Sequence, residues 1–152
     1  MPYLITKRLK LIPFSLNLVQ TILENKVALS DLIGVKVHTE WPQRDFEEIL
    51  PLLYELFRQD PSLSDWVTIL IHTADNTIIG DAGFKDKPNH AREIEIGYSV
   101  IPAYRQQGYA YEAAKALVKW AFKQDSVKLI KADCDIGNVA SSYIKKNLVL
   151  KK

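Results

Sequence analysis

The chain has 152 residues, 47% of them hydrophobic and 25% charged, values typical of one globular domain with a sizeable core. It holds no run near the ~18 apolar residues of a membrane span, and its N-terminus lacks the apolar stretch and cleavage site of a signal peptide, so we expect a soluble, cytoplasmic protein. The net charge is +2, yet residues 115–152 hold nine basic and three acidic side chains; because no aromatic platform lies among these lysines, the pattern favours a solvated surface or long-range attraction for anionic phosphates over nucleic-acid binding.

The first part of the chain predicts one strand and two helices. Residues 4–14 alternate apolar and basic side chains, which indicates a strand. Ser15 is a suitable N-cap for a helix that runs to about residue 26. A second helix is expected over 45–59, with a break or kink at Pro51. Its apolar residues share one side, at Phe46, Ile49, Leu52, Leu53, Leu56 and Phe57.

The middle of the chain predicts three antiparallel strands. Strands at about 66–73 and 77–84 are joined by the turn 74–76, whose Asp and Asn are common turn formers. A third strand, 92–100, alternates two faces. Ile94 and Ile96 lie on one face, and Glu93, Glu95 and Gly97 on the other.

A turn at residues 105–110 joins this strand to an Ala-rich helix over about 107–123. A helix N-terminus carries unpaired amide N–H groups and a partial positive charge, and Gly108 lets the backbone come close to a ligand. The turn therefore suits a pyrophosphate group. It fits neither the Gly-x-Gly-x-x-Gly motif nor a P-loop, and taken alone it is also compatible with close packing of helix on strand.

The last part predicts a strand and a helix. Residues 127–136 alternate apolar and polar side chains, and a final helix begins near Asn138. Cys134 stands on the apolar face of that strand and is expected in the core. As the only cysteine, it cannot form an internal disulfide.

This order of elements, together with six short motifs, resembles the GNAT superfamily of N-acetyltransferases. The 105–110 turn is similar to the family's Arg/Gln-x-x-Gly-x-Gly/Ala signature. Four further stretches look like the RimJ/RimL-type branch, which includes acetylases of ribosomal-protein N-termini as well as enzymes that act on small amines. These four stretches are 5–11, Asp60-Pro61 with Trp66, Ile79-Gly80 with Gly83-Phe84, and Glu95-Ile96-Gly97-Tyr98. In addition, Asn138-Val139-Ala140-Ser141 matches that branch's Asn-x-x-Ser.

The resemblance implies a single α/β (mixed α+β) domain over residues 1–152, with three layers and a central mixed, mostly antiparallel sheet flanked by helices. It also implies acetyl-CoA as co-substrate. Val100 would lie nearest the thioester, because the strand at 98–100 splays from its neighbour and offers backbone groups to the pantetheine amides. The cofactor-binding residues implied in this way are Tyr98, Ser99, Val100, Arg105, Gln106, Gln107, Gly108, Tyr109, Ala110, Tyr111 and Asn138.

The chemistry requires a neutral amine, so a group that accepts the amine proton is expected. Glu95, on the strand face opposite Ile94 and Ile96, is the first candidate and would act through water, and Glu93 is the second. Either carboxylate could instead be a solvated strand residue.

The departing thiolate needs a proton or a hydrogen bond. Some branches of the family use a tyrosine at the position that Lys145 occupies here. Ser141 is the better candidate by the RimL-like pattern, although it could equally be a first-turn serine of the helix, and Tyr143 stays open. Asn138 could bond the cofactor or cap its own helix.

The three histidines, His38, His72 and His90, have no ligand-like spacing, so we expect surface or loop positions and no metal site. Family members usually continue past the Asn-x-x-Ser helix with a Gly-Phe pair and two strands, which this chain lacks. The sheet edge expected at 127–136 would then be unpaired, and a second copy of the chain in a homodimer would cover it.

Two functions therefore stay open. One is an active N-acetyltransferase whose acceptor is a protein N-terminus or a small amine. The other is a module that binds acetyl-CoA but is catalytically weak or regulatory. By the same resemblance, the acceptor is lined by 15–65 and the turn after Phe84, with Trp41, Tyr54 and Trp66 as wall or core residues.

Overall fold

A computed structural model of the protein describes residues 3–132. Its elements, in chain order, are β1 (Leu4–Ile5), β2 (Leu9–Pro13), α1 (Leu16–Glu24), α2 (Lys26–Ile33), β3 (Lys36–Val37), α3 (Arg44–Gln59), the 3-10 helix η1 (Pro61–Trp66), β4 (Val67–His72), β5 (Thr77–Phe84), β6 (Glu93–Val100), the 3-10 helix η2 (Pro102–Tyr104), α4 (Tyr109–Phe122) and β7 (Leu129–Ala132). In this part of the chain no helix is long and apolar enough to cross a membrane.

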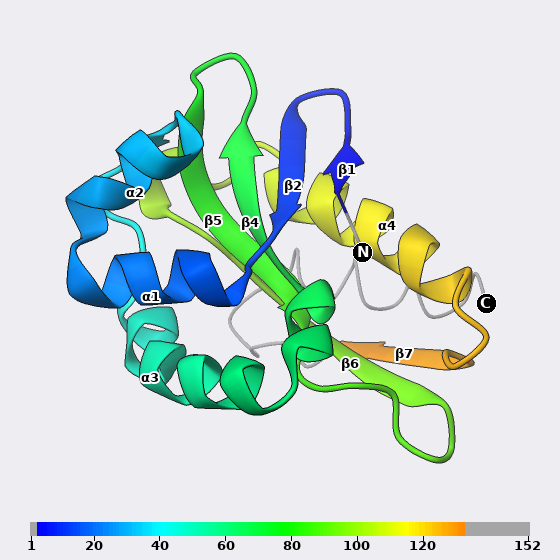
Figure 1. Ribbon diagram of the computed structural model, residues 1–152. Coiled ribbons are helices and arrows are strands. Elements are labelled where there is room, and N and C mark those ends of the chain that lie inside the picture. The colour runs from blue at the N-terminus through cyan, green and yellow to red at the C-terminus, as the bar shows by residue number, and fades with distance from the viewer. Residues whose placement is uncertain (1–2, 133–152) are drawn as a thin grey trace.

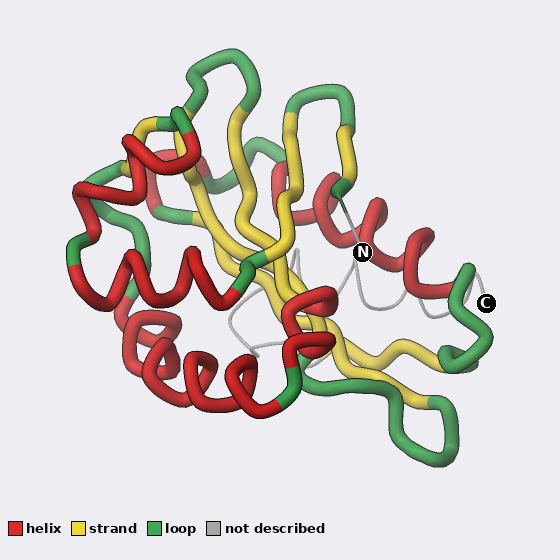
Figure 2. Tube along the Cα trace, viewed as in Figure 1, coloured by secondary structure: helices red, strands yellow, loops and turns green. Residues whose placement is uncertain are grey.

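One sheet of seven strands forms the middle layer, in the order β1-β2-β4-β5-β6-β7, with β3 beside β5. Four of its strand pairs are antiparallel, and the pairs β3–β5 and β6–β7 are parallel. Helices α1 to α3 lie on one side of the sheet and α4 lies on the other (Figure 1). The strands curl strongly from one end of the sheet to the other, as the tube trace shows (Figure 2). The predicted three-layer fold with a mixed, mostly antiparallel sheet is confirmed.

The prediction of one continuous strand over 4–14 was wrong, because these residues form a short hairpin of β1 and β2. The backbone N–H of Thr6 donates to the carbonyl of Leu9 at 2.9 Å, and the Thr6 hydroxyl accepts from the Leu9 N–H at 3.0 Å. This turn folds β1 back on β2, with Leu4 opposite Leu11. A threonine that bonds nearby backbone groups competes with a continuous ladder, and the alternation of side chains alone does not reveal it.

Asn25 divides what the sequence suggested as one helix into two. Ser15 caps α1 as predicted, accepting from the Leu18 N–H at 3.3 Å. The Asn25 N–H then donates to the Thr21 carbonyl at 2.8 Å, and its side chain accepts from the Val27 N–H at 3.0 Å. The same residue therefore ends α1 and begins α2, which the sequence analysis missed.

Helix α3 runs without interruption across Pro51, so the expected break is absent. Pro51 lies exposed, and Leu50 and Phe57 anchor the helix in the core on either side of it. Burial of these two side chains outweighs the loss of one hydrogen bond. Three residues predicted on the packed side, Ile49, Leu52 and Leu56, are instead 42%, 58% and 38% exposed.

The central strands and α4 agree with the sequence prediction. Strands β4 and β5 form an antiparallel hairpin whose turn contains Asn76 with a positive φ of 48°. Ile94 and Ile96 of β6 are buried, and six α4 residues pack on the sheet with them. These are Tyr109, Ala113, Ala114, Leu117, Val118 and Ala121.

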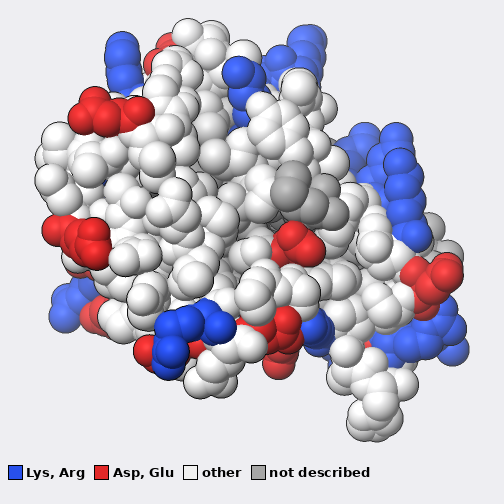
Figure 3. Space-filling view, viewed as in Figure 1, with Lys and Arg blue, Asp and Glu red and all other residues white. Residues whose placement is uncertain are grey.

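The predictions for Cys134, Asn138, Ser141, Tyr143 and the final helix fall outside the described residues. Within the described part of the basic C-terminal region, Lys115 and Lys119 of α4 and Lys123 at its C-cap are exposed. Lys and Arg side chains gather over this helix on the face shown in Figure 3. These lysines therefore lie on a solvated surface, which both interpretations of the basic region require.

Candidate active site

The predicted pyrophosphate turn forms an exposed entrance to α4. Gly108 caps the helix with a left-handed φ of 84°, and Gln106 also has a positive φ, 64°. The first backbone hydrogen bond of the helix runs from the Glu112 N–H to the Gly108 carbonyl at 3.0 Å. The amides of Tyr109 and Ala110 belong to the first turn, where helix geometry supplies no carbonyl partner from within the helix. Residues 105–108 are exposed, so an anion can reach this helix end.

Arg8 lies in the turn just before β2 and bonds residues of this entrance. Its Nη1 donates to the Gln107 carbonyl at 3.0 Å, and its Nε donates to the Glu112 carboxylate at 2.7 Å. The guanidinium also lies 4.2 Å above the Tyr109 ring, a cation–π contact. Burial raises the pKa of Glu112, but hydrogen bonds from Thr6 and Arg8 and the Arg8 charge together lower it below the usual value. Glu112 is therefore ionised and holds Arg8 beside the turn.

Strand β6 ends at Val100, whose carbonyl is held by two side chains. Arg105 Nε donates to it at 2.8 Å and Gln43 Nε2 donates at 2.9 Å. Arg105 Nη2 also donates to Gln43 Oε1 at 2.9 Å. This triangle joins the end of β6, the turn before α4 and the N-terminus of α3. It brings the predicted residues Val100 and Arg105 together.

The backbone of β6 pairs differently along its length. On one side, residues 96–100 pair with β5, from Ile96 opposite Phe84 to Val100 opposite Gly80. On the other side, pairing with β7 covers 93–96 and ends at Ile96 opposite Ala132 within the described residues. The predicted cofactor strand 98–100 thus lies beyond the last described pair with β7.

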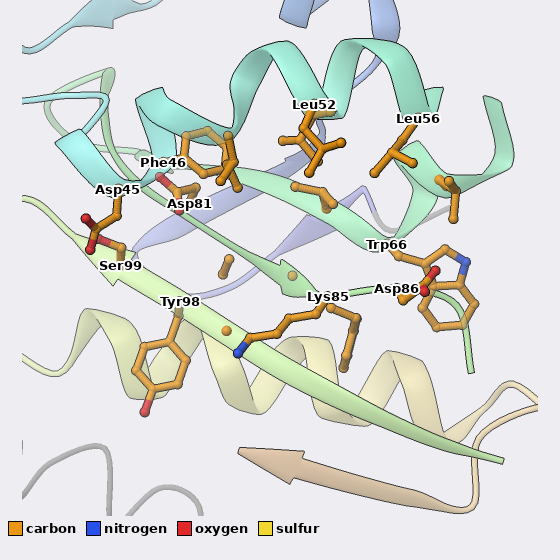
Figure 4. A pocket seen from close by; sticks show the side chains of 18 of the residues that line it. Asp45, Phe46, Leu52, Leu56, Trp66, Asp81, Lys85, Asp86, Tyr98 and Ser99 are labelled. Carbon is orange, nitrogen blue, oxygen red and sulfur yellow. The ribbon is translucent and has the colours of Figure 1, made fainter. Parts of the chain in front are cut away.

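A cavity of about 700 Å³ lies between α3 and the sheet, on the face opposite α4. Its walls are mostly apolar, and Phe46, Leu52 and Leu56 line it along α3 (Figure 4). At one end lie Asp45, Asp81 and Ser99, and at the other Trp66 and Asp86 (Figure 4). Of the three aromatic residues named as wall or core, Trp66 lines the cavity and Trp41 is fully buried, whereas Tyr54 is half-buried.

Asp81 is the buried carboxyl group of this cavity. Its side chain lines the cavity although the residue is only 7% exposed. Trp41 Nε1 donates to Asp81 Oδ2 at 3.0 Å. Burial raises the pKa of Asp81 from 3.8 to about 7, and the Trp41 hydrogen bond opposes that rise. Asp81 therefore changes charge close to neutral pH.

The predicted proton acceptors, Glu95 and Glu93, lie on the strand face that also carries Gly97 and Ser99. Glu95 forms an ion pair with Lys85 at 2.8 Å, and Lys85 lines the cavity. Glu93 lies 3.5 Å from Lys131 of β7. Gly97, which follows Glu95 by two residues on the same strand face, lines the cavity.

His72 corrects the expectation that all three histidines are surface or loop residues. It belongs to β4 and is 9% exposed. Its Nε2 lies 2.9 Å from the Tyr109 hydroxyl, and its Nδ1 accepts from the Asp75 N–H at 3.2 Å. The bonds satisfy a buried imidazole between the sheet and α4, a packing role that spacing in the sequence does not show. Among residues 3–132, no three His, Cys, Asp or Glu are grouped to hold a metal ion.

Sequence reasoning missed three residues that shape this region: Arg8, Gln43 and Asp81. Their partners lie 40 to 104 positions away along the chain. Asp81 alone carried a signal, because it is a charged residue within an otherwise uncharged strand, Thr77–Phe84. A lone carboxylate at such a place is expected to have a specific partner or function.

Comparison with known proteins agrees with the fold. A model of the acetyltransferase (GNAT) domain matches residues 8–148. The chain is 30% identical over 137 residues to YjdG of Bacillus subtilis strain 168, named an uncharacterized N-acetyltransferase, and the match covers 90% of this chain and 82% of YjdG.

Two solved structures illustrate the structural likeness. A GNAT-family acetyltransferase from Bacillus anthracis has a TM-score of 0.60 at 24% identity, covering 97% of this chain and 82% of the other. RimL, a ribosomal-protein N-terminal acetyltransferase in complex with coenzyme A, has a TM-score of 0.63 at 18% identity. That match covers 96% of this chain and 81% of RimL.

Proposed function

The chain belongs to the GNAT family of acetyltransferases, and from that premise we propose that it transfers the acetyl group of acetyl-CoA to a primary amine by direct attack in a ternary complex. The observation that carries this proposal is the exposed helix entrance at Gly108, adjoining the end of β6. The cavity opens on the opposite face of that same strand. A donor and an acceptor could thus approach β6 from two sides.

Acetyl-CoA fits the entrance by chemistry. Gly108 offers backbone without a side chain, and a Cβ placed there would come within 3.4 Å of Arg8 Nη2. Amide N–H groups at a helix N-terminus bind phosphate oxygens. We propose that residues 105–111 hold the pyrophosphate, that Tyr98, Ser99 and Val100 bind the pantetheine arm, and that Asn138 contributes from outside the described residues. RimL, a protein of similar fold, was solved in complex with coenzyme A, which carries the same pyrophosphate and pantetheine groups as acetyl-CoA.

The reaction needs two proton movements. The ammonium form of the acceptor first loses a proton, after which its nitrogen attacks the acetyl carbon. The new C–N bond forms, the C–S bond breaks, and the second nitrogen proton passes to the thiolate. We propose Glu95, with Glu93 as second candidate, for the first proton, and Ser141 as the hydrogen-bond donor that supports the thiolate. Glu95 must leave Lys85 to do this, or act through a water molecule.

The acceptor site is the cavity between α3 and the sheet. Part of its lining comes from the segment 15–65 and from Lys85 and Asp86 after Phe84, where the family resemblance placed the acceptor, and the rest comes from Trp66 and from strands β4, β5 and β6. We propose a protein N-terminus or a small amine as acceptor, and the cytoplasm as the location in which acetyl-CoA is supplied.

Release of free thiol from acetyl-CoA, measured with a panel of amines, tests the activity. The panel holds peptides with different N-terminal residues, polyamines, amino acids and aminoglycosides. Turnover that depends on an amine supports the enzyme. Binding of acetyl-CoA without turnover on any member would support the catalytically weak or regulatory module instead.

Calorimetry with the Gly108→Asp variant tests the cofactor site. The change adds a negative charge and a side chain where backbone meets phosphate, so affinity for acetyl-CoA should fall. Gly34→Asp is the matched control, because Gly34 is exposed with a φ of 70° and nothing lies within 4 Å of its Cβ position. Equal affinities of the two folded variants would overturn the assignment.

A further inference from the structure

The polar end of the cavity holds a buried carboxylate that the proposed reaction does not use. We propose that Asp81 receives the ammonium group of the acceptor, and that the site therefore selects primary amines whose nitrogen carries an apolar group and no neighbouring carboxylate. The inference rests on the proposed N-acetyltransferase function and names the acceptor class of that same site.

The register of the sheet places Asp81 beside the proposed point of attack. Asp81 is paired with Ser99, and the preceding residue, Gly80, is paired with Val100. Side chains that face each other across an antiparallel pair have Cβ atoms ~4.5–5.5 Å apart. An amine nitrogen bound by Asp81 thus lies one residue pair from Val100, where we propose that the thioester sits.

Asp81 has an acceptor position left for a cation. Trp41 Nε1 donates a hydrogen bond to Oδ2. Within residues 3–132 the carboxylate receives no second hydrogen bond. Two cations of this region have other partners, since Lys85, which lines the cavity, pairs with Glu95, and Arg105 bonds Val100 and Gln43. A buried carboxylate without a cation is costly, and an ammonium group from the acceptor removes that cost.

The remaining walls define what the nitrogen carries. Phe46, Leu52 and Leu56 continue the cavity from the Asp81 end along α3, and Trp66 stands at the far end (Figure 4). Apolar groups of the acceptor gain free energy by covering these exposed side chains. A carboxylate next to the ammonium group, as in a free amino acid, would instead meet Asp81 and Asp45 and be repelled.

Acceptor binding should depend on pH through Asp81. Burial raises its pKa to about 7, and a bound ammonium lowers the pKa by favouring the charged form. The other ionisable groups that line the cavity are Asp45 on α3, Lys85 and Asp86 after β5, and Tyr98 on β6. None of these groups is both as buried as Asp81 and hydrogen-bonded to Trp41.

The direct test uses the indole N–H resonance of Trp41 as a reporter, identified by its loss in Trp41→Phe. In the free protein this resonance should titrate with a midpoint near pH 7. Added n-hexylamine should move the midpoint to lower pH, whereas n-hexanol should leave it in place. Asp81→Asn should abolish the titration, and Asp31→Asn, an exposed carboxylate on α2, should retain it.

Kinetics with n-hexylamine provide the second test. Asp81→Asn keeps an oxygen for Trp41 but removes the charge, so apparent KM for the amine should rise on the order of 30-fold or more, with a smaller change in kcat. The KM of wild type should rise as pH falls below 7, and that of the variant should not. The KM for acetyl-CoA should stay constant.

These results separate the inference from the function on which it rests. If no amine supports turnover, the proposed function fails, while the indole titration still shows whether Asp81 binds an ammonium group. If hexylamine is acetylated but Asp81→Asn leaves its KM and pH dependence unchanged, the function stands and the role of Asp81 is overturned. An equal response of the indole to n-hexanol would also overturn it.

Discussion

Replacing Asp81 with Asn should make the protein more stable at neutral and alkaline pH than the wild type. The folded state raises the pKa of Asp81 from 3.8 to about 7 because the group is buried, with an opposing hydrogen bond from Trp41. Between these two pH values the folded state binds a proton that the unfolded state has released. The stability associated with this group is therefore complete below pH 4 and is lost as the pH rises toward 7. Asn has no such titration and still offers an oxygen to Trp41.

The magnitude follows from the pKa difference. A shift of ~3 pKa units corresponds to about 4 kcal/mol at full ionisation, at ~1.4 kcal/mol for each unit. The carboxyl group is already mostly ionised at pH 5 in the unfolded state. The difference in free energy of unfolding between variant and wild type, called the gap below, should therefore widen by about 2–3 kcal/mol from pH 5 to pH 8. Ionisable groups common to both proteins cancel in this difference.

Urea unfolding of both proteins at pH 5, 6, 7 and 8 measures the gap. With a urea dependence of ~1–3 kcal/mol per molar, the midpoints should separate further by about 1–2 M over this range. Asp45→Asn, which replaces an exposed carboxylate that lines the same cavity, is measured beside it as the control. A gap for Asp81→Asn that is constant within ~0.5 kcal/mol would refute burial as the source of the raised pKa.

Further predictions concern the site and the sheet edge. Glu95→Gln should lower kcat by on the order of 10²–10⁴ and flatten the acidic limb of the pH–rate profile with acetyl-CoA affinity unchanged; wild-type turnover would exclude Glu95 as proton acceptor. Gly97→Val should fold normally, since a Cβ there meets only Lys85 Cε at 3.9 Å, yet raise the KM for the amine by filling the cavity floor; an unchanged KM would place the acceptor elsewhere. Arg8→Ala should reduce both acetyl-CoA affinity in calorimetry and stability by about 1–2 kcal/mol in urea, because it removes the bonds to Gln107 and Glu112. Residues 127–152 should contribute to a dimer, since β7 pairs with β6 alone among residues 3–132; light scattering that shows a monomer at high concentration would contradict this.

Local interactions explain which parts of the fold could be predicted from the sequence. Strands β4 to β6 and helix α4 follow from the spacing of apolar residues, which reflects the geometry of each element by itself. The entrance at Gly108 was predictable for the same reason, because a left-handed cap depends on one glycine and its neighbours. The errors also have local causes: Thr6 and Asn25 bond their own backbone and interrupt elements that periodicity would continue.

The electrostatics of the site, in contrast, were decided by tertiary structure. Asp81 acquires its raised pKa only when α3 and the loop that carries Trp41 bury it, 40 positions away in the chain. Arg8 reaches Glu112 across 104 positions, and Ile49, Leu52 and Leu56 of α3 face a cavity rather than the core. The sequence by itself determined most of the elements, the glycine-capped entrance to α4 and the family, because these depend on neighbours along the chain. Only the folded structure decided which carboxylate is buried, because solvent exclusion is a property of segments that meet in space.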